Sequence, residues 1–211
     1  MLLEVLHEGD GRAVFLLDGH PRLGALVDVL KQGLLPLDEG VTHLGEHLLL
    51  EGGVFVYLES EAEFAECIKQ LAPENGWEPL WCTSPKMKQM LGKYGIPFTE
   101  SKEREPKQKL VSLTGCECLV AQTGSIVLSD ALTCTREAYA LPDLLLVYAT
   151  TDQIVPGMRT AFQTVKRKYS KNKPSQMTII TGPSRITDIE QTLVIGASGI
   201  RQVAVFLVDE E

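Results

Sequence analysis

The sequence predicts a three-layer α/β fold with a mainly parallel sheet. Short runs of β-branched and aromatic residues alternate with segments that carry an apolar residue every three or four positions, and this alternation is typical of parallel α/β proteins. With 211 residues, 44% of them hydrophobic, the chain can bury a sizeable core. Its longest apolar runs are far shorter than the roughly 20 residues that cross a bilayer. We therefore expect no transmembrane segment.

The first elements form a series of strand, helix, strand and helix. Residues 54–58 are an apolar run that predicts a buried strand. Ser60 and Glu63 are spaced as a capping box, which begins a helix. A strand over 77–82 and a helix over 85–94 complete the series.

The remaining elements follow a polar loop at 101–109. Two short apolar runs on either side of a glycine turn predict a β-hairpin over 118–129. Further strands are expected at 143–149, 177–180 and 203–208, and a helix over 155–169 with Pro156 near its first turn.

The first 50 residues give the weakest signals of secondary structure in the chain. Their pattern allows a strand at 13–17 and a helix at 23–30. We therefore divide the chain into an N-terminal region, 1–50, which is expected to pack on the main domain, and an α/β domain over 51–211.

The net charge argues against nucleic-acid binding, and the N-terminal residues, which do not match a secretory signal, favour a cytoplasmic protein. The chain carries 28 acidic and 20 basic side chains, a formal net charge of −8. Its densest basic run, 166–173, is interpreted as a solvated helix end, so truncating Lys168 is expected to change little. Glu4 and Asp10 stand where a secretory signal would be basic and then apolar.

The five cysteines have no C-x-x-C spacing, which favours separate reduced thiols. Cys116 and Cys118 stand two apart, which in a strand would place both on one face. Two sulfurs cannot complete a tetrahedral metal site. We expect neither a metal ion nor an iron–sulfur cluster on this chain.

His43, Glu46 and His47 match the H-x-x-E-H pattern, in which two histidines one helical turn apart bind zinc and the glutamate activates water. Glycines within and beside the motif argue against a firm helix, and the motif lacks a third ligand. The preferred interpretation is a solvated or partly buried turn. A zinc peptidase remains an alternative that metal analysis would decide.

Two polar turns are candidates for a ligand site. The turn at 181–185 directly follows a predicted strand, and in open α/β sheets ligands bind at the carboxyl ends of strands. Its glycine, hydroxyls and arginine suit an anion, and the turn at 122–125 adds further hydroxyls. Both turns are also compatible with purely structural roles. The residues to which we assign ligand binding are Thr123, Gly124, Ser125, Gly182, Ser184 and Arg185. Asp188 and Glu190 are candidate acids or bases, although helix capping explains both.

Three stretches resemble the lactate-utilisation protein C family, whose members carry the LUD domain. They are VSLTGCECLVAQTGSIVLS at 111–129, LPDLLLVY at 141–148 and ITGPSRITDIEQTLVIGASGIRQVAVFLVD at 180–209. This chain departs from the family pattern at three places: Gln122 where an acid is frequent, Ile186 where threonine is usual, and Ser198-Gly199-Ile200 in place of histidine-glycine-proline.

The resemblance implies a fold similar to glucosamine-6-phosphate deaminase, ribose-5-phosphate isomerase and the coenzyme A transferases. It also implies a role in oxidising L-lactate to pyruvate with two partner proteins, at least one of which carries iron–sulfur clusters. Because this chain lacks cluster cysteines, we expect it to bind no cofactor itself.

Besides the zinc peptidase, two functions are considered. The first is an accessory component of lactate oxidation that binds a small anion, with Arg185 pairing to a carboxylate or phosphate. The alternative is a free-standing transferase or isomerase acting on a phosphorylated or coenzyme A substrate. An activated carboxylate in the cleft would favour the alternative.

Overall fold

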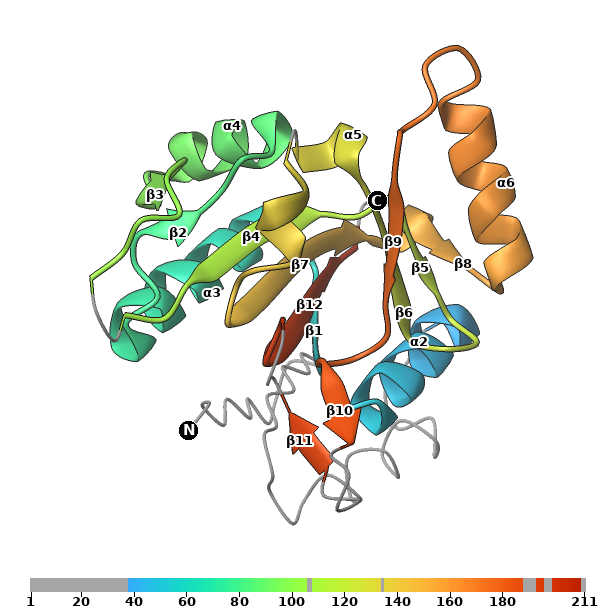
Figure 1. Ribbon diagram of the computed structural model, residues 1–211, viewed down its shortest axis with the longest axis horizontal. Coiled ribbons are helices and arrows are strands. Elements are labelled where there is room, and N and C mark those ends of the chain that lie inside the picture. The colour runs from blue at the N-terminus through green and yellow to red at the C-terminus, as the bar shows by residue number, and fades with distance from the viewer. Residues whose placement is uncertain (1–37, 106–107, 134, 188–192, 196–198, 210–211) are drawn as a thin grey trace.

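The structure, a computed structural model, describes residues 38–105, 108–133, 135–187, 193–195 and 199–209. Its central sheet has six strands, all parallel, in the order β1-β12-β7-β4-β2-β3 (Figure 1). Their bounds are β1 Val54–Leu58, β2 Leu80–Trp81, β3 Phe98–Thr99, β4 Val111–Gly115, β7 Leu144–Thr150 and β12 Gln202–Val208. The predicted α/β fold with a mainly parallel sheet is confirmed.

The central sheet is buried on both faces, which explains its continuous apolar runs. Alternate residues of β7 point to opposite sides. Leu146 and Tyr148 belong to the core on one face, whereas Leu145 and Val147 belong to the core on the other. Every residue of β7 is buried as a result.

Two helices cover the first face, α3 (Glu61–Asn75) and α4 (Pro85–Tyr94). The Ser60 side chain caps α3 by accepting from the Glu63 backbone N–H at 3.2 Å, as predicted. Phe64 of α3 meets the rings of Tyr148 and Phe206 edge-on, with centroids 5.0 Å and 5.3 Å away. Gly95 ends α4 in the left-handed conformation. Local signals therefore predicted this layer correctly.

A second sheet and helix α2 (Glu39–Leu50) cover the opposite face. The sheet has the order β8-β5-β6-β9, with bounds β5 Cys118–Val120, β6 Ser125–Ser129, β8 Ile154–Val155 and β9 Met177–Ile180. β5 and β6 form the predicted hairpin. β9 pairs antiparallel with β6 and so lies outside the parallel sheet.

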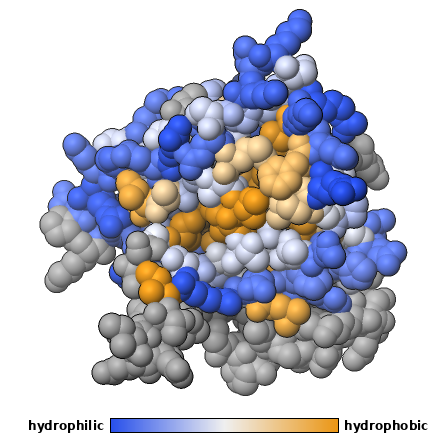
Figure 2. All heavy atoms as spheres, turned by 45° about the vertical axis from the view of Figure 1, so that its right-hand side comes forward, coloured by the Kyte–Doolittle hydropathy of each residue, from blue (hydrophilic) through white to orange (hydrophobic). Residues whose placement is uncertain are grey.

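Helix α6 (Met158–Lys168) packs on the outer face of this second sheet (Figure 1). The helix expected from 155 begins later, because Val155 pairs with Val120 as part of β8 and Pro156 therefore lies before the helix. α6 leaves part of the sheet uncovered. Figure 2 shows hydrophobic residues, in orange, gathered in a band across this side of the molecule.

Several other boundaries differ from the predictions. The strand expected over 77–82 is limited to β2, where Pro79 has no N–H to give to a ladder. A short hairpin joins β10 (Arg185–Thr187) to β11 (Leu193–Ile195), and three short helical segments are α5 Asp130–Thr133, η1 Arg136–Tyr139 and η2 Thr151–Gln153. The elements expected at 13–17 and 23–30 lie outside the described residues. No helix in the described part of the chain is both long and apolar enough to cross a membrane.

Candidate functional site

The carboxyl ends of three neighbouring parallel strands form one polar cluster. Asp209 follows β12, Tyr57 lies near the end of β1, and Thr151 follows β7. The Tyr57 hydroxyl donates to Asp209 Oδ2 at 2.8 Å, and the Thr151 hydroxyl donates to Asp209 Oδ1 at 2.9 Å. This is the edge at which open α/β sheets bind ligands. Sequence reasoning missed the cluster, because the three residues come from separate strands.

Burial, helped by the hydrogen bond to Asp209, raises the pKa of Tyr57 from 10.0 to about 12. The unfolded chain therefore loses this proton first as the pH rises. The resulting stability is complete below about pH 10 and is lost as the pH rises through the folded pKa. We expect Tyr57→Phe to lose less thermal stability than the parent between about pH 9 and about pH 11. Melting curves at both pH values, with Tyr94→Phe of α4 as control, test this; parallel losses in all three proteins would contradict it.

A cavity of about 1250 Å³ opens beside this cluster. Helix α2, the second sheet and the start of α6 form its other walls. Its charged and titratable members, apart from Tyr57, are Asp38, Glu39, Glu46, Asp209, His43 and His47. The described lining has neither lysine nor arginine. The cavity therefore suits a ligand with hydroxyl or ammonium groups. Carboxylates and imidazoles can accept hydrogen bonds from such groups and can exchange protons with them.

The H-x-x-E-H motif lies on a regular helix, so the expectation of a loose turn was wrong. The Asp38 side chain caps α2 by accepting from the Gly40 N–H at 2.8 Å, and Gly45 is buried against the core. His43, Glu46 and His47 line the cavity. Among the described residues, no three His, Cys, Asp or Glu side chains gather as a metal site would require. The absence of bound metal stays a prediction.

The two polar turns meet, as the argument for a shared site requires. The hydroxyl oxygens of Thr123 and Ser125 are 2.7 Å apart, and Ser125 Oγ is 2.7 Å from Thr181 Oγ1. Both turns also pack against α2. A Cβ added to Gly124 would overlap the backbone of His47 and Leu48.

The second turn contacts the residue that follows α2. A Cβ on Gly182 would overlap the Glu51 carbonyl, and Arg185 donates to the same carbonyl oxygen. The Arg185 guanidinium also lies 3.4 Å from the Glu51 carboxylate. Three of the six predicted ligand-binding residues, Gly124, Gly182 and Arg185, therefore contact the end of α2. The Ser184 N–H donates to Ile200 O at 2.8 Å. The ligand-binding role of the six residues stays a prediction, and Asp188 and Glu190 lie outside the described residues.

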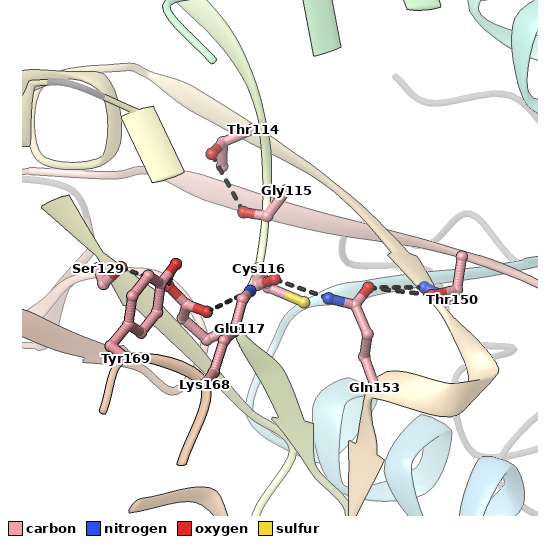
Figure 3. Close-up of polar contacts among 9 residues, drawn as sticks. All are labelled: Thr114, Gly115, Cys116, Glu117, Ser129, Thr150, Gln153, Lys168 and Tyr169. Atoms are coloured by element: carbon pink, nitrogen blue, oxygen red, sulfur yellow. Dashed lines mark hydrogen bonds and ion pairs between the residues drawn. The ribbon is translucent and has the colours of Figure 1, made fainter. Parts of the chain in front are cut away.

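A buried carboxylate that the sequence did not reveal lies between the second sheet and α6 (Figure 3). The Glu117 side chain is 0% exposed. It accepts hydrogen bonds from the Ser129 hydroxyl, from Lys168 Nζ at 2.8 Å and from the Tyr169 hydroxyl at 2.9 Å. These donors satisfy a charge that burial alone would make costly.

Lys168 is exposed, as predicted, but its ammonium also pairs with the buried Glu117 carboxylate, which the sequence analysis missed. Burial tends to lower its pKa, but the hydrogen bond and charge of Glu117 outweigh this, so the pKa is raised. Burial, followed by the hydrogen bond to Glu117, also raises the pKa of Tyr169. The cluster fastens the end of α6 to the sheet.

Cys116 and Cys118 do not share a face. Cys116 packs in the core between the two sheets, whereas Cys118 packs beneath α6. The expectation failed because Cys116 and Glu117 form the link from β4 to β5 and are not in a strand. Burial raises the pKa of Cys118 to about 11, which disfavours a reactive thiolate.

The chain is a layered α/β domain with a polar cavity at the carboxyl edge of its parallel sheet. The family model of the LUD domain matches residues 42–208. The chain belongs to the LUD domain family. Gln122, one of its departures from the family pattern, lines the cavity.

Curated relatives are named "Lactate utilization protein C". The protein of Bacillus subtilis (strain 168) is 30% identical over 113 residues, covering 53% of this chain and 47% of the relative. That of Deinococcus radiodurans is 33% identical over 97 residues, or 46% of this chain and 45% of the relative. That of Geobacillus thermodenitrificans is 25% identical over 169 residues, or 79% and 68%. The chain thus spans about half the length of the first two relatives.

A solved structure supports the fold. The crystal structure of a DUF162 family protein from Deinococcus radiodurans matches with a TM-score of 0.56 at 18% identity, covering 82% of this chain and 99% of that chain. A likeness at this identity shows the fold alone.

Proposed function

We propose that this chain is a cytoplasmic accessory component of L-lactate utilisation, acting with iron–sulfur proteins in the oxidation of L-lactate to pyruvate. Its membership of the LUD family, together with relatives named for lactate utilisation, carries the proposal. The oxidation releases two electrons and two protons per lactate. Because the cysteines lack cluster spacing, the clusters that accept the electrons belong to the partners.

Deleting the gene is expected to impair growth on L-lactate and to leave growth on glucose intact, because only the first carbon source depends on this oxidation. Growth curves of the deletion strain, with and without the restored gene, measure the effect. The strain must carry no second lactate dehydrogenase. Normal growth on lactate in such a strain would refute the proposal.

The ligand we propose for the paired turns is a small carboxylate or phosphate facing Arg185. Two observations support this location: the linked hydroxyls of Thr123, Ser125 and Thr181, and an Arg185 side chain that is 38% exposed. The Glu51 carboxylate, 3.4 Å from Arg185 Nη1, occupies the position that the ligand would take. A carboxylate of the protein thus competes with an incoming anion.

This competition predicts that two substitutions change the affinity for the anion in opposite directions. Glu51→Gln is expected to bind the anion several-fold more tightly, and Arg185→Lys about tenfold more weakly, because lysine keeps the charge but loses the bidentate fork. Calorimetric titration with L-lactate, pyruvate and inorganic phosphate measures both, with Arg104→Lys as a distant control and melting curves to verify folding. Unchanged affinity in both variants would remove Arg185 from the site.

The cavity favours a second candidate, a free-standing isomerase or transferase. Glu46, His47 and Asp209 place proton-exchanging groups at the carboxyl edge of the sheet. The described lining offers no cation to a phosphate, which counts against a phosphorylated substrate inside it. Turnover by the purified chain without partner proteins, lost in Asp209→Asn, would establish this candidate.

A further inference from the structure

The outer face of the second sheet is only partly covered by α6. Ala161 and Val165 pack with residues of β5, β6 and β8. β9 is the edge strand, and in its register with β6 Ile179 lies opposite Val127, so both side chains lie on this outer face. Val127 is fully buried, yet Ile179 is 42% exposed. The helix therefore leaves the β9 side of the face open.

One flank of α6 borders this open area. Phe162 and Tyr169 are seven residues apart and so lie on the same side of the helix. The Tyr169 hydroxyl contacts Glu117, which also binds Ser129 of β6, so this flank faces β6 and β9. Phe162 is 47% exposed. We define the α6–β9 face as Phe162, Met177 and Ile179, on the side of the molecule where Figure 2 shows the apolar band.

The segment that contains α6 and β9 carries only basic charges. Residues 153–180 contain six bases and no acid, in a chain whose net charge is −8. Within the described residues only Lys168 of these six makes an ion pair, and the others, all exposed, are Arg159, Lys166, Arg167, Lys171 and Lys173. An apolar centre with an unpaired basic rim complements an acidic partner with apolar side chains.

The edge of β9 supplies the backbone part of recognition. Among the described strands, β9 pairs only with β6, and no described residue forms a hydrogen bond with the N–H and C=O groups of its other edge. Such an edge can accept an additional strand. A second copy of this chain is a poor occupant, because a symmetric contact would place two basic rims against each other.

We propose that the α6–β9 face docks an extended segment of a different protein, with acidic and apolar residues, that adds a strand to β9. The proposal rests on the proposed function in one respect, the choice of binding partners for the test. These partners are the iron–sulfur lactate-utilisation proteins of the same organism. Apolar side chains of the segment contact Phe162 and Ile179, and its carboxylates pair with the basic rim.

Biolayer interferometry with each purified iron–sulfur protein tests the proposal. Ile179→Glu, Phe162→Glu and the double variant Lys166→Glu/Arg167→Glu are each expected to weaken binding by about tenfold or more. Two matched controls, Leu141→Glu at an equally exposed leucine and Lys86→Glu on α4, are expected to bind like the parent. All the altered positions are exposed, and melting curves verify folding.

The outcomes separate this surface from the proposed function. Equal binding by parent and face variants would overturn the docking surface while leaving the partnership intact. Failure of the parent to bind either protein would overturn the docking proposal, whereas growth on lactate decides the proposed function independently. A dimer of the parent, seen by ultracentrifugation and lost in Ile179→Glu, would overturn the docking proposal and show that a second copy of this chain occupies the face.

Discussion

Replacing Gly124 by alanine is expected to destabilise the protein by about 3 kcal/mol, from backbone strain and overpacking together. Gly124 has φ 60°, a left-handed conformation that costs other residues about 1–2 kcal/mol. The added Cβ would also overlap backbone atoms of His47 and Leu48. Because the backbone of a helix cannot yield as a side chain can, the hairpin and α2 must separate. Urea unfolding measures the loss.

Gly76→Ala is the matched control for this substitution. Gly76 has nearly the same backbone angle, φ 66°, but its added Cβ would meet no atom within 4 Å. It is expected to cost only the backbone strain, about 1 kcal/mol. The difference between the two variants isolates the contact with α2. Equal losses at both glycines would show that the hairpin tip does not hold the helix.

Truncating Lys168 to alanine is expected to destabilise the protein by about 2 kcal/mol. Removal of the ammonium leaves the buried Glu117 carboxylate with two neutral hydroxyl donors, Ser129 and Tyr169. The loss should fall below that of a fully buried pair, because the Lys168 side chain is 48% exposed. Chemical unfolding at neutral pH measures it.

Lys166→Ala provides the comparison on the same helix. Lys166 is exposed and makes no ion pair with any described residue. Its removal is expected to change stability by less than about 0.5 kcal/mol. Because both variants replace a lysine by alanine in the last turn of α6, the difference chiefly reports the contact with Glu117. Similar small losses in both variants would restore the interpretation of Lys168 as a solvated side chain.

Elements whose signals lie within a few residues were predictable. Ser60 and Glu63 cap α3 across three positions, and Gly95 ends α4, so neighbouring residues determine where these helices begin and end. The hairpin of β5 and β6 was predictable for the same reason. By contrast, the run at 177–180 predicted a strand but not the strand with which it pairs. An apolar pattern indicates burial and does not indicate which strand lies beside it.

The candidate site was predicted less completely than the fold. The turns at Thr123 and Thr181 were recognised from local composition, and the structure brings them together at 2.7 Å through Ser125. Glu51 opposite Arg185 and Asp209 beside Tyr57 were missed, because these pairs are 134 and 152 positions apart. Side chains so distant in sequence leave no local signal.

Short-range patterns and motif identity were enough to indicate the α/β class, the buried parallel strands, the helix caps and the family. The folded arrangement was needed to see that two glycine turns contact the end of α2, that β9 belongs to the second sheet, and that Glu117 is buried against Lys168. These features arise when packing brings distant segments together, and the free energy of burial then selects which polar groups must find partners.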